Sequence, residues 1–172
     1  CFHNVIWSDS LLPVSLAKTD IKSMYNVLAV PSWLRTYFGI PPVTANGRTR
    51  FPGFAALPMG WSHAVRLAQA FSVTVVESAL FPYRAFRLRN GRTYKFVRSD
   101  EVLFFVYIDD VGLFYSVPDL LMEIMEVVVN AFEKILLPVN QKKTVWPGSK
   151  RIEVLGLSLS SRGLLAPSPT KL

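Results

Sequence analysis

Cysteine is almost absent from the 172-residue sequence, which contains only Cys1. A disulfide framework within the chain and a zinc site built on several cysteines are therefore both excluded. Long uncharged apolar runs are also missing, since the most apolar long segment, residues 119–137, contains five charged side chains. That composition is typical of a helix packed on a sheet rather than one in lipid. No secretory signal is visible, so we expect an intracellular protein, in the cytoplasm or the nucleus, without membrane partners.

Acidic residues are scarce relative to basic ones, with 12 Asp and Glu against 19 Lys and Arg and a net charge of +7. A positive excess favours polyanionic partners, nucleic acid first. Hydrophobic residues make up 51% of the chain, enough for a core in one domain. Because the sequence does not begin with Met and ends abruptly at Leu172, we expect a fragment of a longer polypeptide.

Hydrophobic patterning predicts three strands and two long helices. Strands are expected over residues 14–21, 101–108 and 111–115, where apolar and β-branched residues dominate. Helices are expected over residues 61–80 and from Pro118 to Leu137. This order predicts an α+β fold, with an antiparallel sheet of about four strands and both main helices on one face.

Weaker signals predict the remaining elements. Pro52 confines a strand over residues 49–57 to a sheet edge. Asn90-Gly91 predicts the turn of an inserted basic hairpin. Closing strands are expected over 143–147 and 151–159, with Leu155-Gly156 inside the second strand.

Two segments carry carboxylates at predicted strand ends. The sequence Tyr-Ile-Asp-Asp (107–110) follows a strongly apolar strand, and Asp20 ends another. Asp is a common turn and helix-capping residue, so each segment alone is also explained by an ordinary turn or cap. Two adjacent carboxylates repel each other, however, and a divalent cation would remove that cost.

Three further motifs each have an ordinary alternative. Leu-Pro-Met-Gly (57–60) leads into the helix over 61–80, as in many strand–turn–helix connections. Asn140 and Lys143 lie in a segment that also reads as a solvated basic loop, and Leu155-Gly156 also fits an ordinary hairpin.

The order of these motifs resembles the reverse transcriptase family, over roughly residues 14 to 171. The resemblance implies one palm domain over residues 1–172, with the fingers mostly missing and the thumb absent; these parts would belong to the parent chain. The closing segment is most similar to retroelements of the long-terminal-repeat or tyrosine-recombinase groups.

The resemblance also implies a chemistry. Asp20 and Asp109, assisted by Asp110, would bind two Mg²⁺ or Mn²⁺ ions, in a site that Ile21 lines through its backbone amide. Lys143 would act as a general acid toward the leaving pyrophosphate. The substrates would be dNTPs and a primed RNA or DNA template.

Other positions match nucleotide- and template-binding residues of the family. Tyr25 would lie under the incoming sugar and favour deoxynucleotides, although it also reads as a core aromatic. Met59, Gly60 and the preceding Pro58 would contact the incoming nucleotide and the template, with Met59 replacing a more polar Gln. Tyr107, Leu155 and Gly156 would hold the primer and template.

The stretch between Gly60 and Asp109 is longer than the family pattern leads us to expect, and the surplus is the basic hairpin over residues 84–98. We expect Arg84, Arg87, Arg89 and Arg92 to contact nucleic-acid phosphates, with a solvated hairpin as the alternative. Two other functions stay open for the chain: a catalytically inactive palm that serves as a nucleic-acid-binding scaffold, and an RNA-templated RNA polymerase. The aromatic at Tyr25 and the Tyr-x-Asp-Asp sequence argue against the RNA polymerase.

Overall fold

The centre of the computed structural model, which describes residues 5–8, 12–96, 98–163 and 165–168, is a four-stranded sheet in the order β2–β8–β7–β5. Strands β2, β8 and β7 are antiparallel to one another, whereas β5 joins the edge of β7 in parallel. The four strands are β2 (Ser15–Asp20), β5 (Ala85–Arg87), β7 (Val102–Tyr107) and β8 (Asp110–Tyr115).

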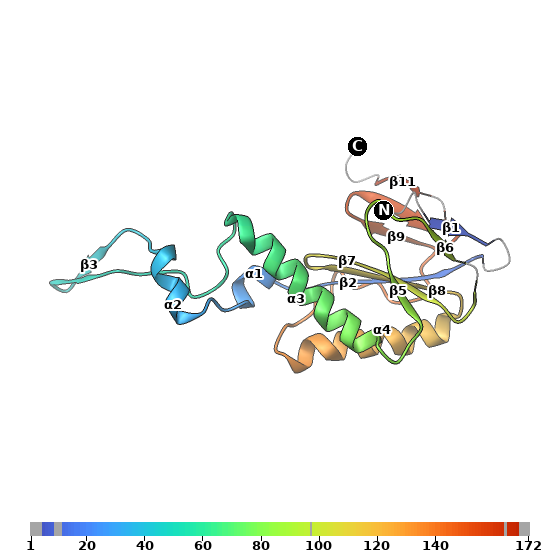
Figure 1. Ribbon diagram of the computed structural model, residues 1–172, viewed down its shortest axis with the longest axis horizontal. Helices are drawn as coiled ribbons and strands as arrows, with labels where there is room; N and C mark the ends of the chain where they lie inside the picture. The colour runs from blue at the N-terminus through green and yellow to red at the C-terminus, as the bar shows by residue number, and fades with distance from the viewer. Residues whose placement is uncertain (1–4, 9–11, 97, 164, 169–172) are drawn as a thin grey trace.

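Two long helices, α3 (Ser62–Leu80) and α4 (Pro118–Lys134), pack on the same face of this sheet (Figure 1). The alternation of side chains along a strand explains the two cores. In β7, Val102 and Phe104 belong to the core beneath the helices, whereas Leu103 and Phe105 belong to a second core on the opposite face. The predicted α+β fold with two main helices on one face is confirmed. Within the described residues, no helix is both long and apolar enough to cross a bilayer.

The second core is covered by two small sheets. Strands β9 (Arg151–Val154), β10 (Leu157–Ser160) and β11 (Leu165–Pro167) form an antiparallel sheet, and β1 (Val5–Trp7) pairs in parallel with β6 (Tyr94–Phe96). The chain around Gly163 packs so closely on the Trp7 ring that a Cβ there would lie 2.7 Å from it. The two small sheets therefore meet above the central one.

The predicted hairpin around Asn90-Gly91 is wrong, although the chain does turn there. Gly91 has a φ of +74°, but β5 pairs with β7 and β6 pairs with β1, so the two flanking strands do not pair with each other. A local turn signal does not specify the pairing partner, and here both partners come from distant segments.

Two predicted closing strands also differ. The strand expected over 151–159 is two strands, because Leu155 and Gly156 both have positive φ and form a tight turn between β9 and β10. The strand expected over 143–147 is reduced to a single bridge between Val145 and Lys18.

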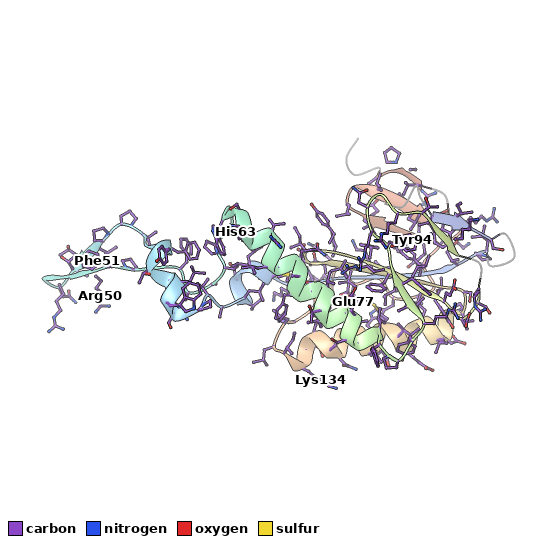
Figure 2. All side chains as sticks on the ribbon, viewed as in Figure 1. Arg50, Phe51, His63, Glu77, Tyr94 and Lys134 are labelled. Carbon is purple, nitrogen blue, oxygen red and sulfur yellow. The ribbon has the colours of Figure 1, made fainter. Side chains whose placement is uncertain are left out.

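A long arm leaves the sheet after α1 (Met24–Val27) and returns at α3 (Figure 1). It contains α2 (Ser32–Arg35), a 3₁₀ turn η3 (Thr36–Phe38) and a hairpin of β3 (Val43–Ala45) and β4 (Arg48–Arg50). Asn46 and Gly47, with φ of 52° and 70°, close this hairpin. The edge strand predicted over 49–57 is shorter than expected, because β4 ends at Arg50 and only isolated bridges follow at Gly53 and Ala56. Arg50 and Phe51 lie at the far end of the arm (Figure 2).

Candidate active site

Asp20 and Asp110 are paired across two neighbouring strands. They are partners in the β2–β8 register, and the Ile21 amide donates to the carbonyl of Asp109 at 2.9 Å. Since directly paired residues of antiparallel strands point to the same face, both carboxylates lie on the face away from the helices. The structure thus pairs Asp20 with Asp110 and places Asp109 in the adjoining turn. The Ile21 amide, expected to line the site, instead donates this hydrogen bond to the backbone of Asp109.

Gly112 determines how closely β7 and β8 approach each other beside Asp110. The ring of Phe105, its partner on β7, lies across Gly112, and a Cβ there would come within 1.9 Å of Phe105 Cε1. Only glycine leaves room for the aromatic ring at this point of the sheet.

The β7–β8 turn consists of Ile108 and Asp109, and α3 holds it through one side chain. Ile108 has a φ of 55°, a left-handed conformation that is unfavourable for a β-branched residue. The Gln69 amide group accepts a hydrogen bond from the Ile108 N–H at 2.8 Å and donates one to the Val106 carbonyl at 3.0 Å. Gln69 therefore compensates for the strain of the turn that carries Asp109.

Two lysines offset the negative charge. Lys143 Nζ donates to Asp20 Oδ2 at 3.1 Å, and this hydrogen bond raises the pKa of Lys143. Lys18 Nζ lies 4.0 Å from Asp110 Oδ1 and donates to the Glu153 carbonyl at 2.7 Å. Burial raises the pKa of Asp110, the Lys18 ammonium opposes that rise, and the Asp109 and Asp20 carboxylates add to it.

The donor set fits a hard divalent cation, because compact carboxylate oxygens are the ligands such ions prefer. Asp20, Asp109 and Asp110 come from adjoining strand ends, in line with such a site. Within the part of the chain that the structure describes, no three His, Cys, Asp or Glu side chains are gathered as a metal cluster. Asp20 is instead paired with Lys143.

Tyr25 lies beside the carboxylates. Burial raises its pKa, and so do the nearby charges of Asp109 and Tyr107. It also packs against the main core, so the role expected at the site and the alternative of a core aromatic are compatible. Tyr107 is half exposed at the end of β7.

The Pro58–Gly60 turn lies at the N-terminus of α3, where the arm returns to the sheet. Met59 is 75% exposed and Gly60 has a φ of +92°, so the turn presents backbone and a thioether to solvent. Trp61, at the base of the arm, packs edge-on against Phe38 with ring centroids 4.9 Å apart.

The structure divides the basic residues of segment 84–98 into two groups. Arg84 lies 3.5 Å from Glu101, Arg87 lies 3.1 Å from Glu77, and Arg98 lies 2.8 Å from Asp100. Arg89, Arg92 and Lys95 are exposed, and none forms an ion pair with a described residue. The sequence did not distinguish the two groups because Glu77 is remote in the chain.

Sequence analysis also missed the parts played by Gln69 and Lys18. Gln69 stands in an otherwise apolar stretch of α3, and Lys18 interrupts an apolar strand two residues before Asp20. An isolated polar residue on a buried face was the available signal in both cases, since such a residue must find a partner.

Comparison with known proteins shows to which family the chain belongs. The family model described as reverse transcriptase (RNA-dependent DNA polymerase) matches residues 1–159. No curated protein sequence matches the chain significantly.

Solved structures of a foamy viral protease–reverse transcriptase have a similar fold. The form named dRH in complex with double-stranded DNA superposes with a TM-score of 0.64 at 15% identity, covering 91% of this chain and 22% of that one. The complexes with an RNA/DNA hybrid and with double-stranded DNA each give a TM-score of 0.61 at 16% identity, covering 17% and 27% of those chains. This chain thus spans about a quarter or less of the viral proteins. Because the family model includes Asp20 and the Asp109-Asp110 pair, the chain belongs to the reverse transcriptase (RNA-dependent DNA polymerase) family.

Proposed function

We propose that the chain is the palm of an RNA-directed DNA polymerase that extends a primer with dNTPs. The pairing of Asp20 with Asp110 across β2 and β8, with Asp109 in the adjoining turn, carries this proposal. Crowding of like charges is costly unless a cation or a charged substrate compensates it. The arrangement therefore serves a purpose in an enzyme that it would not serve in a scaffold.

Asp20, Asp109 and Asp110 would hold two divalent cations, Mg²⁺ or Mn²⁺. When bound, such ions lower the pKa of an attacking hydroxyl and stabilise a leaving phosphate oxygen. The protein's own residues then position the reactants. Lys143, which donates a hydrogen bond to Asp20, would donate a proton to the leaving pyrophosphate.

Selection of the nucleotide would depend on Tyr25 and the Pro58–Gly60 turn. The charge of Asp109 contributes to the raised pKa of Tyr25, and the Tyr25 ring would exclude a 2′-hydroxyl on the incoming sugar. Exposed Met59 offers packing but only a weak hydrogen-bond acceptor to the nucleotide. The tight Leu155-Gly156 turn between β9 and β10 would support the primer end, together with Tyr107 at the end of β7.

Nucleic acid is the proposed partner, as primed RNA or DNA. A net charge of +7 supports a polyanionic ligand. The solved relatives are complexes with double-stranded DNA and with an RNA/DNA hybrid. We further assign the chain to a retrotransposon-like element, on the sequence resemblance of its closing segment.

Primer extension on a primed RNA template tests the proposal. The longest parent chain that contains this sequence and its Asp109→Asn variant are compared with Mg²⁺ or Mn²⁺, and with dNTPs against NTPs. Incorporation of dNTPs that disappears in the variant supports a reverse transcriptase that uses Asp109. Preference for NTPs would instead favour an RNA polymerase. A folded protein that binds the template but incorporates no nucleotide would favour the inactive scaffold.

A further inference from the structure

Lys143 lies in a short turn, residues 140–143, that β2 holds from both sides. Before the turn, the Asn140 N–H donates to the carbonyl of Asp20 at 2.7 Å. After the turn, Lys18 and Val145 exchange backbone hydrogen bonds of 2.9 and 2.8 Å. The backbone that carries Lys143 is therefore attached to the strand that ends in Asp20.

The carbonyl of Asn140 closes this turn. It accepts hydrogen bonds from the Lys143 N–H at 2.9 Å, from the Thr144 N–H at 3.0 Å and from the Thr144 hydroxyl at 3.0 Å. A carbonyl oxygen accepts through its two lone pairs, so these donors use its full capacity. The side chain of Thr144 thus reinforces a turn that backbone hydrogen bonds already close.

The Thr144 hydroxyl also lies 2.8 Å from the hydroxyl of Thr19. A hydroxyl has a single hydrogen to donate. Because the hydrogen of Thr144 goes to the Asn140 carbonyl, the Thr19 hydroxyl is the donor of this second bond. Thr19 is fully buried, on the same face of β2 as the core residue Ala17. One hydroxyl therefore joins the turn to the buried side of β2.

The side chain of Lys143 is less constrained than its backbone. It is 61% exposed, and among the described residues its ammonium group donates a hydrogen bond only to Asp20 Oδ2, at 3.1 Å. A lysine carries its charge on a flexible stem, so the ammonium can leave Asp20 but stays within a distance of its own Cα. The attachment of the turn to β2 therefore determines which atoms the ammonium can reach.

We propose that the Thr144 hydroxyl positions Lys143 for proton donation, and that the Thr19 hydroxyl supports Thr144 in this task. Thr144 touches no reactant and acts through the turn that carries Lys143, which makes it a positioning residue. Geometry matters here because a misplacement of a reacting group by about 1 Å costs about 10²-fold in rate. The inference rests on the proposed function, in which Lys143 is the general acid.

The competing explanation is that the two threonines only satisfy each other in a buried place. Removing one hydroxyl of such a pair leaves the other unsatisfied, whereas replacing both by apolar groups of the same shape is nearly neutral for stability. In Thr19→Val/Thr144→Val the stability should therefore recover, while the bond to the Asn140 carbonyl stays lost. A positioning role keeps the rate of this double variant low, and a purely structural role restores it.

Single-turnover nucleotide addition by the longest parent chain that contains this sequence tests the proposal, together with the midpoint of unfolding. Thr144→Val should lower the maximal rate about tenfold or more and leave the dNTP concentration for half-maximal rate near that of wild type. Thr144→Ser retains the hydroxyl and should retain most of the rate. The double valine variant should unfold near the wild-type midpoint and remain slow.

Two further variants show whether Thr144 acts through Lys143. In a Lys143→Met background the proton donor is absent, so Thr144→Val should cause no further loss of rate. Thr74→Val is the matched control, because it removes an exposed hydroxyl that donates to the Ala70 carbonyl at 2.9 Å, within α3. It should change neither the rate nor the unfolding midpoint.

Several results would overturn the positioning role while leaving the proposed function intact, since the wild-type chain would still add dNTPs. These are a wild-type rate in Thr144→Val, a recovered rate in the double valine variant, and a further loss when Thr144→Val is added to Lys143→Met. A wild-type rate in Lys143→Met would also overturn it, because no general acid would be left to position. A parent chain that adds no nucleotide overturns the proposed function and this inference with it.

Discussion

The ammonium group of Lys18 lies 4.0 Å from Oδ1 of Asp110 while donating to the backbone carbonyl of Glu153. One side chain thus connects the catalytic strand pair with strand β9, which leads to the proposed primer support. It is also the largest of the influences that keep the pKa of Asp110 from rising further through burial.

Replacement of Lys18 by Met should therefore change the pH dependence of primer extension. A raised pKa means that Asp110 becomes fully ionised only at higher pH, so the rate should increase with pH through that pKa. Without the ammonium the pKa rises further, and the acidic limb of the profile should move to higher pH. We expect a lower rate on the acidic limb of the profile and the same plateau once Asp110 is fully ionised. The control is Lys134→Met, and superimposable profiles for wild type and Lys18→Met would contradict this role.

Gln69 should be essential for the geometry of the turn. In Gln69→Leu the Ile108 N–H and the Val106 carbonyl both lose their partner, in a partly buried place. We expect a loss of about 1–3 kcal/mol in the free energy of unfolding, measured by urea denaturation. Primer extension should fall even at temperatures where the variant is fully folded, since Asp109 follows Ile108 directly. Gln141→Leu, at an exposed position, is the control and should leave the free energy of unfolding unchanged. Equal stability of the two variants would contradict the stabilisation of the turn by Gln69.

Gly112 gives a test of the strand packing beside Asp110. Gly112→Ala places a methyl group against Phe105, and we expect a destabilisation of about 1–3 kcal/mol from overpacking. Phe105→Leu removes the ring that causes the clash. In the Phe105→Leu/Gly112→Ala double variant the two losses should therefore not add. Additive losses in thermal or urea unfolding would show that the ring does not lie across Gly112.

Elements whose signal lies within one segment were predictable from the sequence, whereas strand pairings between distant segments were not. Helix α3 and strands β7 and β8 are predictable because the pattern of apolar residues within each segment indicates its secondary structure. Asn46-Gly47 is an equally local turn signal for the β3–β4 hairpin. The pairing partners of β5 and β6, in contrast, lie in segments distant in the chain. No sequence pattern specifies such long-range parallel pairing.

The candidate site shows the same division. The motif order predicted the carboxylates and Lys143 as site residues; in the structure Asp20 pairs with Asp110 and contacts Lys143. The hydrogen bonds of Gln69 and the contact of Lys18 with Asp110 join residues from separate elements, so they emerge only from the fold. The pairing of Arg87 with Glu77 is of the same kind.

Substitution of Lys143 should affect catalysis strongly and stability only slightly. Its side chain is 61% exposed, so loss of the ion pair with Asp20 should cost little stability. As a general acid, however, it should contribute about 10²–10⁴-fold to nucleotide addition. Lys143→Met should therefore reduce the maximal rate by that order and leave the unfolding midpoint nearly unchanged. The adjacent exposed residue supplies the control, since Lys142→Met removes the same charge without a contact to Asp20.

Lys143→Met should also change the Mg²⁺ concentration that the enzyme requires. Because the Lys143 ammonium is hydrogen-bonded to Asp20, it competes with a cation for that carboxylate. Half-maximal activity of Lys143→Met should then require less Mg²⁺ than the wild type, even though its maximal rate is lower. A rate equal to wild type at saturating Mg²⁺ would mean that Lys143 only balances charge. A lower rate with a higher Mg²⁺ requirement would mean that it positions Asp20 rather than donating a proton.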